Sequence, residues 1–409
     1  MPPSLLPDRR RAVVTGLGVV SALGSGASAL SLALREARSG IGPLTLFDPA
    51  PYGARVAGQA PAPGTRFLGR TPRSASRADR FALDAAAEAL AEAQLPEATL
   101  EASAVVLGTG AGGAELAEGY LAGLRLRGER HTPVSQLAHQ PPASSTDLVG
   151  NTFGSHGPRL SLMTACSSSA TAIGVALDWI RVGRAECVIT GGTDALCALT
   201  FGGFTTLRAL DPEACRPFHR QRRGLTLGEG AAILVLEEAE AARKRGARTR
   251  GEIAGYGVSA DAHHLTAPHP DGRGAVHAMQ RALADAELEA AEVDYVNAHG
   301  TGTPQNDLAE ARAIRAVFGE LSSRVPVSST KAMTGHPLGA AGAIEAVVCL
   351  LALEEQLLPA TLRLDDPDPA CPLDLVPLQP RSASLGVVLS NSFAFGGNNT
   401  ALVLRRWPA

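Results

Sequence analysis

The pattern of hydrophobic and polar positions divides the chain into two kinds of segment that alternate along it. Short runs rich in β-branched residues predict buried strands. These runs are AVVTGLGVV (12–20), AVVLGTG (104–110), ECVITGG (186–192) and AAILVLEEAE (231–240). Ala- and Leu-rich stretches with helical spacing, such as 80–95 and 169–183, lie between them. Strands and helices that alternate in this way predict an α/β fold in which helices cover a sheet.

A second series of the same kind begins near residue 250. It consists of predicted strands at 251–260, 293–300 and 326–331 and predicted helices at 275–293 and 306–319. This order resembles the order in the first part of the chain. We therefore expect two related α/β halves, an N-terminal half over residues 1–250 and a C-terminal half over residues 251–409.

Composition narrows the classes of function. The 409 residues are 45% hydrophobic with a formal net charge of -3, which indicates neither nucleic-acid nor membrane binding. No apolar run reaches the roughly 18 residues of a membrane span, and MPPSLLPDRRRAVVTG lacks the apolar segment of a secretory signal. Six scattered cysteines without Cys-x-x-Cys spacing predict neither a disulfide framework nor a metal site. We expect a cytoplasmic protein.

Cys166 stands out among these cysteines because of its surroundings in SLMTACSSSATAIGVALDWI (161–180). The pattern predicts a strand, a tight turn of small residues and then a helix. Such a turn exposes a nucleophile and leaves backbone N–H groups free to hold an oxyanion. A helix N-terminus and a nearby imidazole would lower the pKa of the thiol. A small buried residue at a helix start is the alternative for this cysteine.

Two histidines favour the chemical interpretation of Cys166. His299 in VNAHGTGTP and His336 in SSTKAMTGHPLGAAG each follow a predicted strand, in the Gly- and Thr-rich turns where α/β proteins place their sites. Lys331 lies in the second of these motifs. Because only Lys244 and Lys331 are lysines in a chain rich in arginine, its position is notable.

The segments TACSSS, NAHGTGT, SSTKAMTGHPLGAAG and NSFAFGGNN, in this order, resemble the signature blocks of the β-ketoacyl-acyl carrier protein synthases. These condensing enzymes of fatty acid and polyketide synthesis are decarboxylating acyltransferases, and the elongation type has a Cys-His-His triad. The likeness extends over nearly the whole chain. It implies a thiolase-like fold with five layers, α-β-α-β-α, usually as a homodimer. It implies no metal and no cofactor, since the substrates are carried on the phosphopantetheine of an acyl carrier protein.

The resemblance also implies a role for each matching residue. Cys166 matches the nucleophile, His299 and His336 the pair that binds the malonyl thioester carbonyl, Lys331 an electrostatic organiser, and Glu345 the carboxylate that orients this network. Phe395 matches a gating residue whose N–H, with that of Cys166, forms the oxyanion hole. Thr301, Thr303, Ala111, Gly396 and Gly397 match substrate-binding positions, with Ala111 at the acyl pocket. Arg208, with Arg66, Arg70 and Arg73, matches the basic surface that docks the acidic carrier protein.

The chain departs from the family pattern in RPFHRQRRGLTLGEG, where His219, Gln221 and Arg223 replace acidic residues. These substitutions are either surface drift, altered loop anchoring or an added basic contact for a partner. A small residue at Ala111 suggests that longer or stiffer acyl chains fit. Both features favour a specialised polyketide or polyene pathway over fatty acid elongation.

Three alternatives differ from an active synthase. A chain-length-factor-like partner subunit in a ketosynthase heterodimer generally lacks the cysteine that this chain has at Cys166. A thiolase condenses without decarboxylation and typically has a second cysteine at the position of the FAFGG loop. A cysteine hydrolase requires a single Cys-His pair, which the two histidines and Lys331 fit poorly. The motifs leave open the acyl length, the carrier protein, and whether the partner subunit is identical or different.

Overall fold

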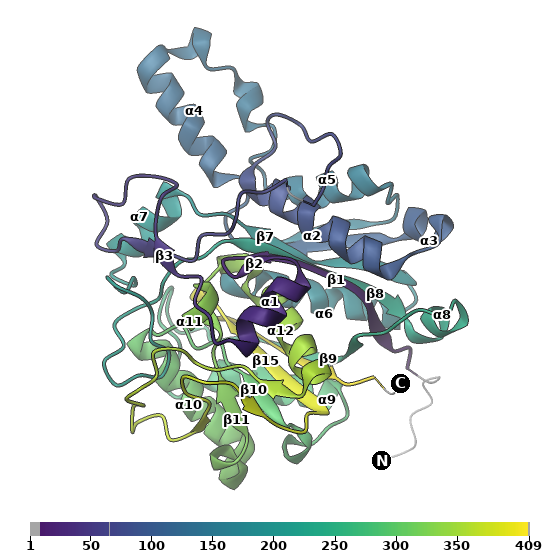
Figure 1. The fold of residues 1–409 in the computed structure, drawn as a ribbon, viewed down its shortest axis with the longest axis vertical. Coiled ribbons are helices and arrows are strands. Elements are labelled where there is room, and N and C mark those ends of the chain that lie inside the picture. Colours follow the sequence, from purple (N-terminus) through teal and green to yellow (C-terminus); the bar gives the residue numbers. More distant parts are fainter. Residues whose placement is uncertain (1–8, 65, 408–409) are drawn as a thin grey trace.

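One mixed sheet of 12 strands runs through the molecule in the computed structural model, which describes residues 9–64 and 66–407 (Figure 1). Its strand order is β13-β11-β10-β15-β16-β9-β1-β8-β7-β5-β6, and β2 pairs with β1 outside this path. The strands are β1 (Ala12–Ser21), β2 (Gly24–Ser25), β5 (Ala104–Gly108), β6 (Arg159–Leu162), β7 (Cys187–Asp194), β8 (Gly230–Glu238), β9 (Gly251–Ala260), β10 (Tyr295–Asn297), β11 (Pro326–Ser328), β13 (Asp374–Leu375), β15 (Val387–Phe393) and β16 (Asn398–Arg405). Two small sheets pair β3 (Gly42–Pro43) with β4 (Val56–Ala57) and β12 (Leu357–Leu358) with β14 (Arg381–Ser382).

The two halves of the large sheet share one strand order and one set of directions. In the first half, β1 is antiparallel to β8, β8 is antiparallel to β7, and β7, β5 and β6 run parallel. In the second half, β9, β16, β15, β10 and β11 repeat this pattern. The halves join where β1 pairs with β9. The repetition predicted from the order of elements is present in the topology, while the boundary at residue 250 stays a prediction.

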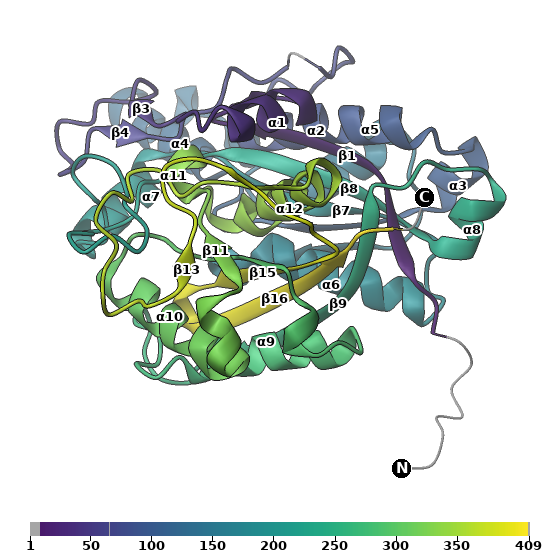
Figure 2. The ribbon, with the colours of Figure 1, turned by 60° about the horizontal axis from the view of Figure 1, so that its bottom comes forward.

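Helices fill a layer between the two half-sheets and cover both outer faces (Figure 2). They are α1 (Ala27–Arg35), α2 (Arg77–Ala93), α3 (Glu97–Ala102), α4 (Ala114–Arg127), α5 (Ser144–Phe153), α6 (Ser168–Arg181), α7 (Ala198–Thr206), α8 (Ala239–Lys244), α9 (Arg273–Asp285), α10 (Pro304–Phe318), α11 (Lys331–Thr334) and α12 (Ala341–Glu355). Helices α6 and α12 pack against each other and against strands of both halves, so they form the middle layer. Helix α2 covers β1, β8 and β7, and α9 covers β9 and β16. The expected five-layered α/β arrangement is confirmed.

The apolar pattern of each helix accounts for its layer. Helix α12 has the sequence AGAIEAVVCLLALEE and is buried on all sides from Ala341 to Leu353, as expected for a helix between two sheets. Helix α9 buries only one stripe, with Ala275, Ala278, Met279 and Ala282 at helical spacing, so it lies on an outer face.

One predicted helix is shorter than its pattern suggested. The helix expected over 275–293 ends at Asp285, and Glu287 has a left-handed φ of 57°. The N–H of Glu287 donates to the carbonyl of Ala284 at 3.1 Å, and that of Leu288 donates to Leu283 at 3.0 Å. This is the hydrogen-bond pattern of a Schellman motif. The polar residues after it form a turn and a short 3₁₀ segment, which apolar periodicity alone does not distinguish from helix.

Candidate active site

Cys166 lies in a single 3₁₀ turn, η3 (Ala165–Ser167), between β6 and α6. Ala165 has a left-handed φ of 52°, which makes the turn sharp. Ser168 braces it, because its Oγ accepts from the N–H of Thr164 at 2.9 Å and donates to the carbonyl of Ala165 at 2.6 Å. The predicted strand, turn and helix around this thiol are confirmed.

Two glycines allow the start of α6 to approach the sheet closely. A Cβ on Gly108 in β5 would lie 2.3 Å from the carbonyl carbon of Ser168. A Cβ on Gly192 in β7 would lie 2.6 Å from the Cβ of Ser169. No larger residue fits at either place without backbone movement. This contact holds the Cys166 turn against β5 and β7.

Burial dominates the acidity of Cys166. The side chain is only 6% exposed, and its removal from water raises the pKa of the thiol to about 12. The charge of Lys331 and the backbone N–H of Phe395 act in the opposite direction without overcoming burial. The sequence interpretation of a lowered pKa is therefore wrong for this state of the site. The thiol of Cys166 is therefore protonated at physiological pH in this structure.

His299 and His336 face each other at the floor of the site. His299 follows β10 and His336 follows α11, and their rings lie 5.3 Å apart at 85°. Burial lowers the pKa of both imidazoles well below the usual value, and the charge of Lys331 lowers both further. Both rings are therefore neutral at physiological pH. Neither ring nitrogen of His336 has a hydrogen-bond partner among the described residues, and His336 contributes to the lining of the cavity that contains Cys166.

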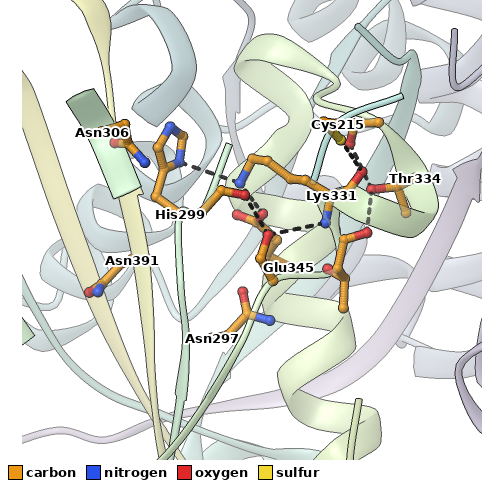
Figure 3. A network of polar contacts seen from close by, with 12 residues as sticks. Cys215, Asn297, His299, Asn306, Lys331, Thr334, Glu345 and Asn391 are labelled. Carbon is orange, nitrogen blue, oxygen red and sulfur yellow. Dashed lines mark hydrogen bonds and ion pairs between the residues drawn. The ribbon is translucent and has the colours of Figure 1, made fainter. Parts of the chain in front are cut away.

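Lys331, at the first position of α11, connects this pair to a buried carboxylate (Figure 3). Its ammonium forms an ion pair with Glu345 of α12 and lies 3.4 Å from Nδ1 of His299. An ammonium can only donate, so Nδ1 of His299 must accept. The proton of the neutral ring is then on Nε2. The network thereby makes Nε2 of His299 a hydrogen-bond donor.

Two acids that sequence analysis missed hold the loops of the site. Glu310 in α10 accepts from the backbone N–H groups of His299 and Gly300, both at 2.8 Å, and burial raises its pKa to about 7. Asp194 at the end of β7 accepts from three backbone N–H groups, those of Gly110, Ala111 and Gly339, at 2.6 to 2.8 Å. In the sequence, Glu310 and Asp194 could have been noticed only as acidic residues within segments whose other residues on the same helix or strand face are predicted to be buried.

Phe395 belongs to the 3₁₀ turn η7 (Phe395–Gly397) and lines the same cavity as Cys166. Its ring stacks on Phe204 at a centroid distance of 5.6 Å and an interplanar angle of 25°. Gly396 and Gly397 have left-handed φ values of 82° and 75°, which other residues adopt only with strain. They shape the turn that directs the Phe395 N–H to the thiol of Cys166.

A cavity of about 350 Å³ brings most of the predicted reacting groups together. Its lining includes Cys166, His299, His336, Phe395, Thr301, Thr303 and Arg208. The hydroxyls of Thr301 and Thr303 lie 3.0 Å apart. Lys331 and Glu345 do not line the cavity but lie buried behind His299. The buried inner wall of the cavity therefore has the Cys166 thiol and the two imidazoles.

Some predicted residues lie elsewhere. Ala111, Gly396 and Gly397 do not line this cavity, and neither do Arg66, Arg70 and Arg73. The three arginines are exposed, and Arg66 lies 3.5 Å from Glu88. The roles of these six residues in binding the acyl chain or a carrier protein stay predictions.

The departures at 219–223 have different structural positions. His219 is buried, its Nδ1 accepts from the N–H of Gln221 at 2.9 Å, and its Nε2 lies 3.3 Å from Asp365. It therefore anchors this loop and is not a surface residue. Gln221 is exposed, and Arg223 lines the cavity.

Residues 9–64 and 66–407 contain neither a cluster of metal ligands nor a membrane-spanning helix. In this part of the chain no group of three or more His, Cys, Asp and Glu side chains is arranged to hold a metal ion. No helix within it has the length and apolar character needed to cross a membrane.

Comparisons with known proteins agree with the geometry of the site. Two family models match, "Beta-ketoacyl synthase, N-terminal domain" over residues 9–242 and "Beta-ketoacyl synthase, C-terminal domain" over residues 250–365. The 3-oxoacyl-[acyl-carrier-protein] synthase 2 of Synechocystis sp. is 41% identical, covering 98% of this chain and 99% of the relative. A solved structure described as the ishigamide ketosynthase/chain length factor superposes with a TM-score of 0.94 at 37% identity, covering 98% and 100%. The AntDE:AntF structure, a type II acyl-carrier protein in complex with its ketosynthase, superposes with a TM-score of 0.88 at 30% identity, covering 98% and 100%.

Proposed function

The chain belongs to the β-ketoacyl synthase family and has 3-oxoacyl-[acyl-carrier-protein] synthase activity, and we propose that it extends polyketide or polyene chains by condensation at Cys166. The observation that supports this proposal most directly is the cavity whose inner wall holds one thiol and two neutral imidazoles. Each of these groups has a separate task in a decarboxylative condensation.

In the first half-reaction, Sγ of Cys166 attacks the thioester carbonyl of the acyl carrier protein. Because burial keeps the thiol protonated, its proton leaves as the C–S bond forms, and a neutral imidazole of the same cavity accepts it. The oxyanion of the tetrahedral intermediate accepts from the N–H groups of Cys166 and Phe395. Collapse expels the pantetheine thiolate, which takes up the proton and leaves an acyl-Cys166.

In the second half-reaction, the malonyl thioester enters with its carbonyl oxygen toward the two imidazoles. Nε2–H of His299, held in this tautomer by Lys331, donates to that oxygen, and His336 supplies a second donor. Loss of CO2 places the C–C electron pair in an enolate, whose charge these donors stabilise. The enolate carbon attacks the acyl carbonyl and expels the Cys166 thiolate, which is reprotonated.

The choice of a specialised pathway rests on two observations. The ishigamide ketosynthase/chain length factor structure superposes with a TM-score of 0.94 over 98% of this chain. Arg223 adds a positive charge to the cavity in a segment where the family pattern is acidic. The 41% identity to a 3-oxoacyl-[acyl-carrier-protein] synthase 2 supports fatty acid elongation as the second candidate.

The proposed partners follow from the same chemistry. The substrates would arrive on an acyl carrier protein, whose acidic surface suits the exposed Arg66, Arg70 and Arg73, while Arg208 lines the cavity that receives the arm. A second ketosynthase-like subunit, identical or of the chain-length-factor type, would complete the assembly. Structures of related proteins with a carrier protein and with a chain length factor support both proposals.

Intact-protein mass spectrometry tests the function and the pathway together. The wild type and Cys166→Ala are incubated with saturated or polyunsaturated acyl carrier proteins of equal length, and then with malonyl carrier protein. We expect only the wild type to gain the acyl mass, faster from the polyunsaturated carrier, and to release a ketoacyl product. Faster acylation by the saturated carrier would favour fatty acid elongation. No acylation from any carrier would favour the partner-subunit alternative.

A further inference from the structure

Two exposed arginines, Arg208 and Arg223, line the cavity that contains Cys166. The segment around Leu210 runs parallel to the segment around Leu225, and these two residues form an isolated bridge. The N–H of Leu225 donates to the carbonyl of Ala209, and the N–H of Asp211 donates to the carbonyl of Leu225, both at 2.8 Å. Arg208 and Arg223 each precede one of these bridged residues by two positions.

Both side chains belong to the cavity that contains Cys166, and both have unused donors. Arg208 is exposed, and its guanidinium has no hydrogen-bond or ion-pair partner among residues 9–64 and 66–407. Arg223 is about half exposed and uses only Nη2, which lies 3.3 Å from Asp211 and 3.5 Å from Glu213. Its Nε and Nη1 groups are free for a further acceptor.

Other charged groups also lie near this pair. Asp211 is buried and serves as the counter-ion that places Arg223. Asp261 also lines the cavity, and its carboxylate accepts from Nδ2 of Asn399 at 2.8 Å and from the N–H of His269 at 3.1 Å. Arg220, in the same loop as Arg223, pairs with Asp366 and does not line the cavity. Arg208 and Arg223 are therefore the two arginines among the described residues that line this cavity, and both are exposed.

We propose that Arg208 and Arg223 bind the phosphodiester of the phosphopantetheine arm when its thiol end lies at Cys166. This proposal rests on the proposed function, and it names a subsite for that function. The arm has one permanent negative charge, at the end remote from its thiol. With the thiol at the inner wall, this charge lies toward the opening. Guanidinium groups donate in a fork that matches phosphate oxygens, so two of them fix the depth to which the arm enters.

Carrier-free thioesters isolate the phosphate contact from contacts with the carrier protein. The probes are an acyl-phosphopantetheine and the same acyl-pantetheine without phosphate, and the measurement is the second-order rate of Cys166 acylation by intact mass. We expect the wild type to prefer the phosphorylated probe by about five- to tenfold at low salt, and less at high salt. Arg223→Gln and Arg208→Gln should each bring this ratio toward one.

Two further variants provide controls. Arg220→Gln should retain the wild-type ratio, because it removes a charge from the same loop but not from the cavity. Arg223→Lys keeps a cation beside Asp211 and should retain part of the preference, which separates loss of the phosphate contact from misfolding of the loop.

Each unfavourable outcome has a separate meaning. A ratio near one in the wild type, or an unchanged ratio in both Gln variants, would overturn the phosphate subsite. If the variants slow acylation only from intact acyl carrier protein, the arginines contact carboxylates of the carrier, and the proposal is wrong. If neither probe acylates Cys166, and acyl carrier proteins do not acylate it either, the proposed function would be overturned instead.

Discussion

Replacing Lys331 by methionine tests the electrostatic core of the site, because this ammonium contacts both Glu345 and His299. Lys331→Met removes the donor that holds His299 as its Nε2–H tautomer, and leaves Glu345 buried without its counter-ion. Loss of a hydrogen bond to a charged group corresponds to about 1.5–3 kcal/mol, or roughly a 10- to 150-fold slower decarboxylation. Breaking a buried ion pair on one side destabilises a protein by about 3–5 kcal/mol.

A double variant separates these two effects. Lys331→Met/Glu345→Gln also lacks the ammonium, so it should decarboxylate malonyl carrier protein as slowly as the single variant. It no longer buries an uncompensated carboxylate, so its thermal midpoint should recover toward that of the wild type. The assays are CO2 release from malonyl carrier protein and thermal melting. Wild-type decarboxylation by the double variant would refute the reasoning, because Lys331 would then serve only as the counter-ion of Glu345.

The pH dependence of these variants provides a second check. The pKa of His299 is lowered first by burial and then by Lys331, so removing that charge should raise the pKa. The acid limb of the decarboxylation profile should then move to higher pH. Burial raises the pKa of Glu345 and Lys331 opposes this shift, so the pKa rises further in Lys331→Met. A carboxyl whose pKa is higher in the folded state than in the unfolded state destabilises the protein increasingly as pH rises from the unfolded-state pKa to the folded-state pKa. The stability deficit of the single variant should therefore grow as pH increases above about 4.5.

The remaining predictions concern single positions. His336→Ala should slow decarboxylation by about 100-fold or more, the effect of losing an oxyanion donor, while acylation of Cys166 is reduced less; equal losses in both steps would contradict the assigned role. Alkylation of Cys166 by iodoacetamide should be slow at neutral pH and accelerate up to a pH near 12, since burial raises the pKa of the thiol to about 12; a plateau near pH 7 would show an activated thiolate. Gly108→Ala should destabilise the protein by about 1–3 kcal/mol, because its Cβ would lie 2.3 Å from the backbone of α6. Gly119→Ala is the control and should not destabilise the protein, because a Cβ there meets open space. A melting temperature of Gly108→Ala equal to that of the wild type would disprove the close approach. Ala111→Met should shift acylation toward shorter acyl chains, and an unchanged chain-length preference would remove this residue from the acyl pocket.

Local sequence patterns were sufficient to predict those structural features that neighbouring residues in the sequence determine. The alternation of apolar strands and helices predicted the layered α/β fold, and small residues around Cys166 predicted the sharp turn that the structure has. The helix over 275–293 was predicted too long, because the turn at Glu287 depends on a left-handed φ that has no apolar signature. These successes and this error all lie within single segments.

The sequence by itself determined which chemical groups this protein has, since Cys166, His299 and His336 stand in local motifs that are typical of their function. Only the tertiary structure decided how these groups behave. It placed the ammonium of Lys331 at Nδ1 of His299 and brought Arg223 and Arg208 to the same cavity. The physical reason is that acidity, tautomer and charge pairing depend on burial and on neighbours distant in the chain, so the same thiol that a helix start would activate has its pKa raised by removal from water.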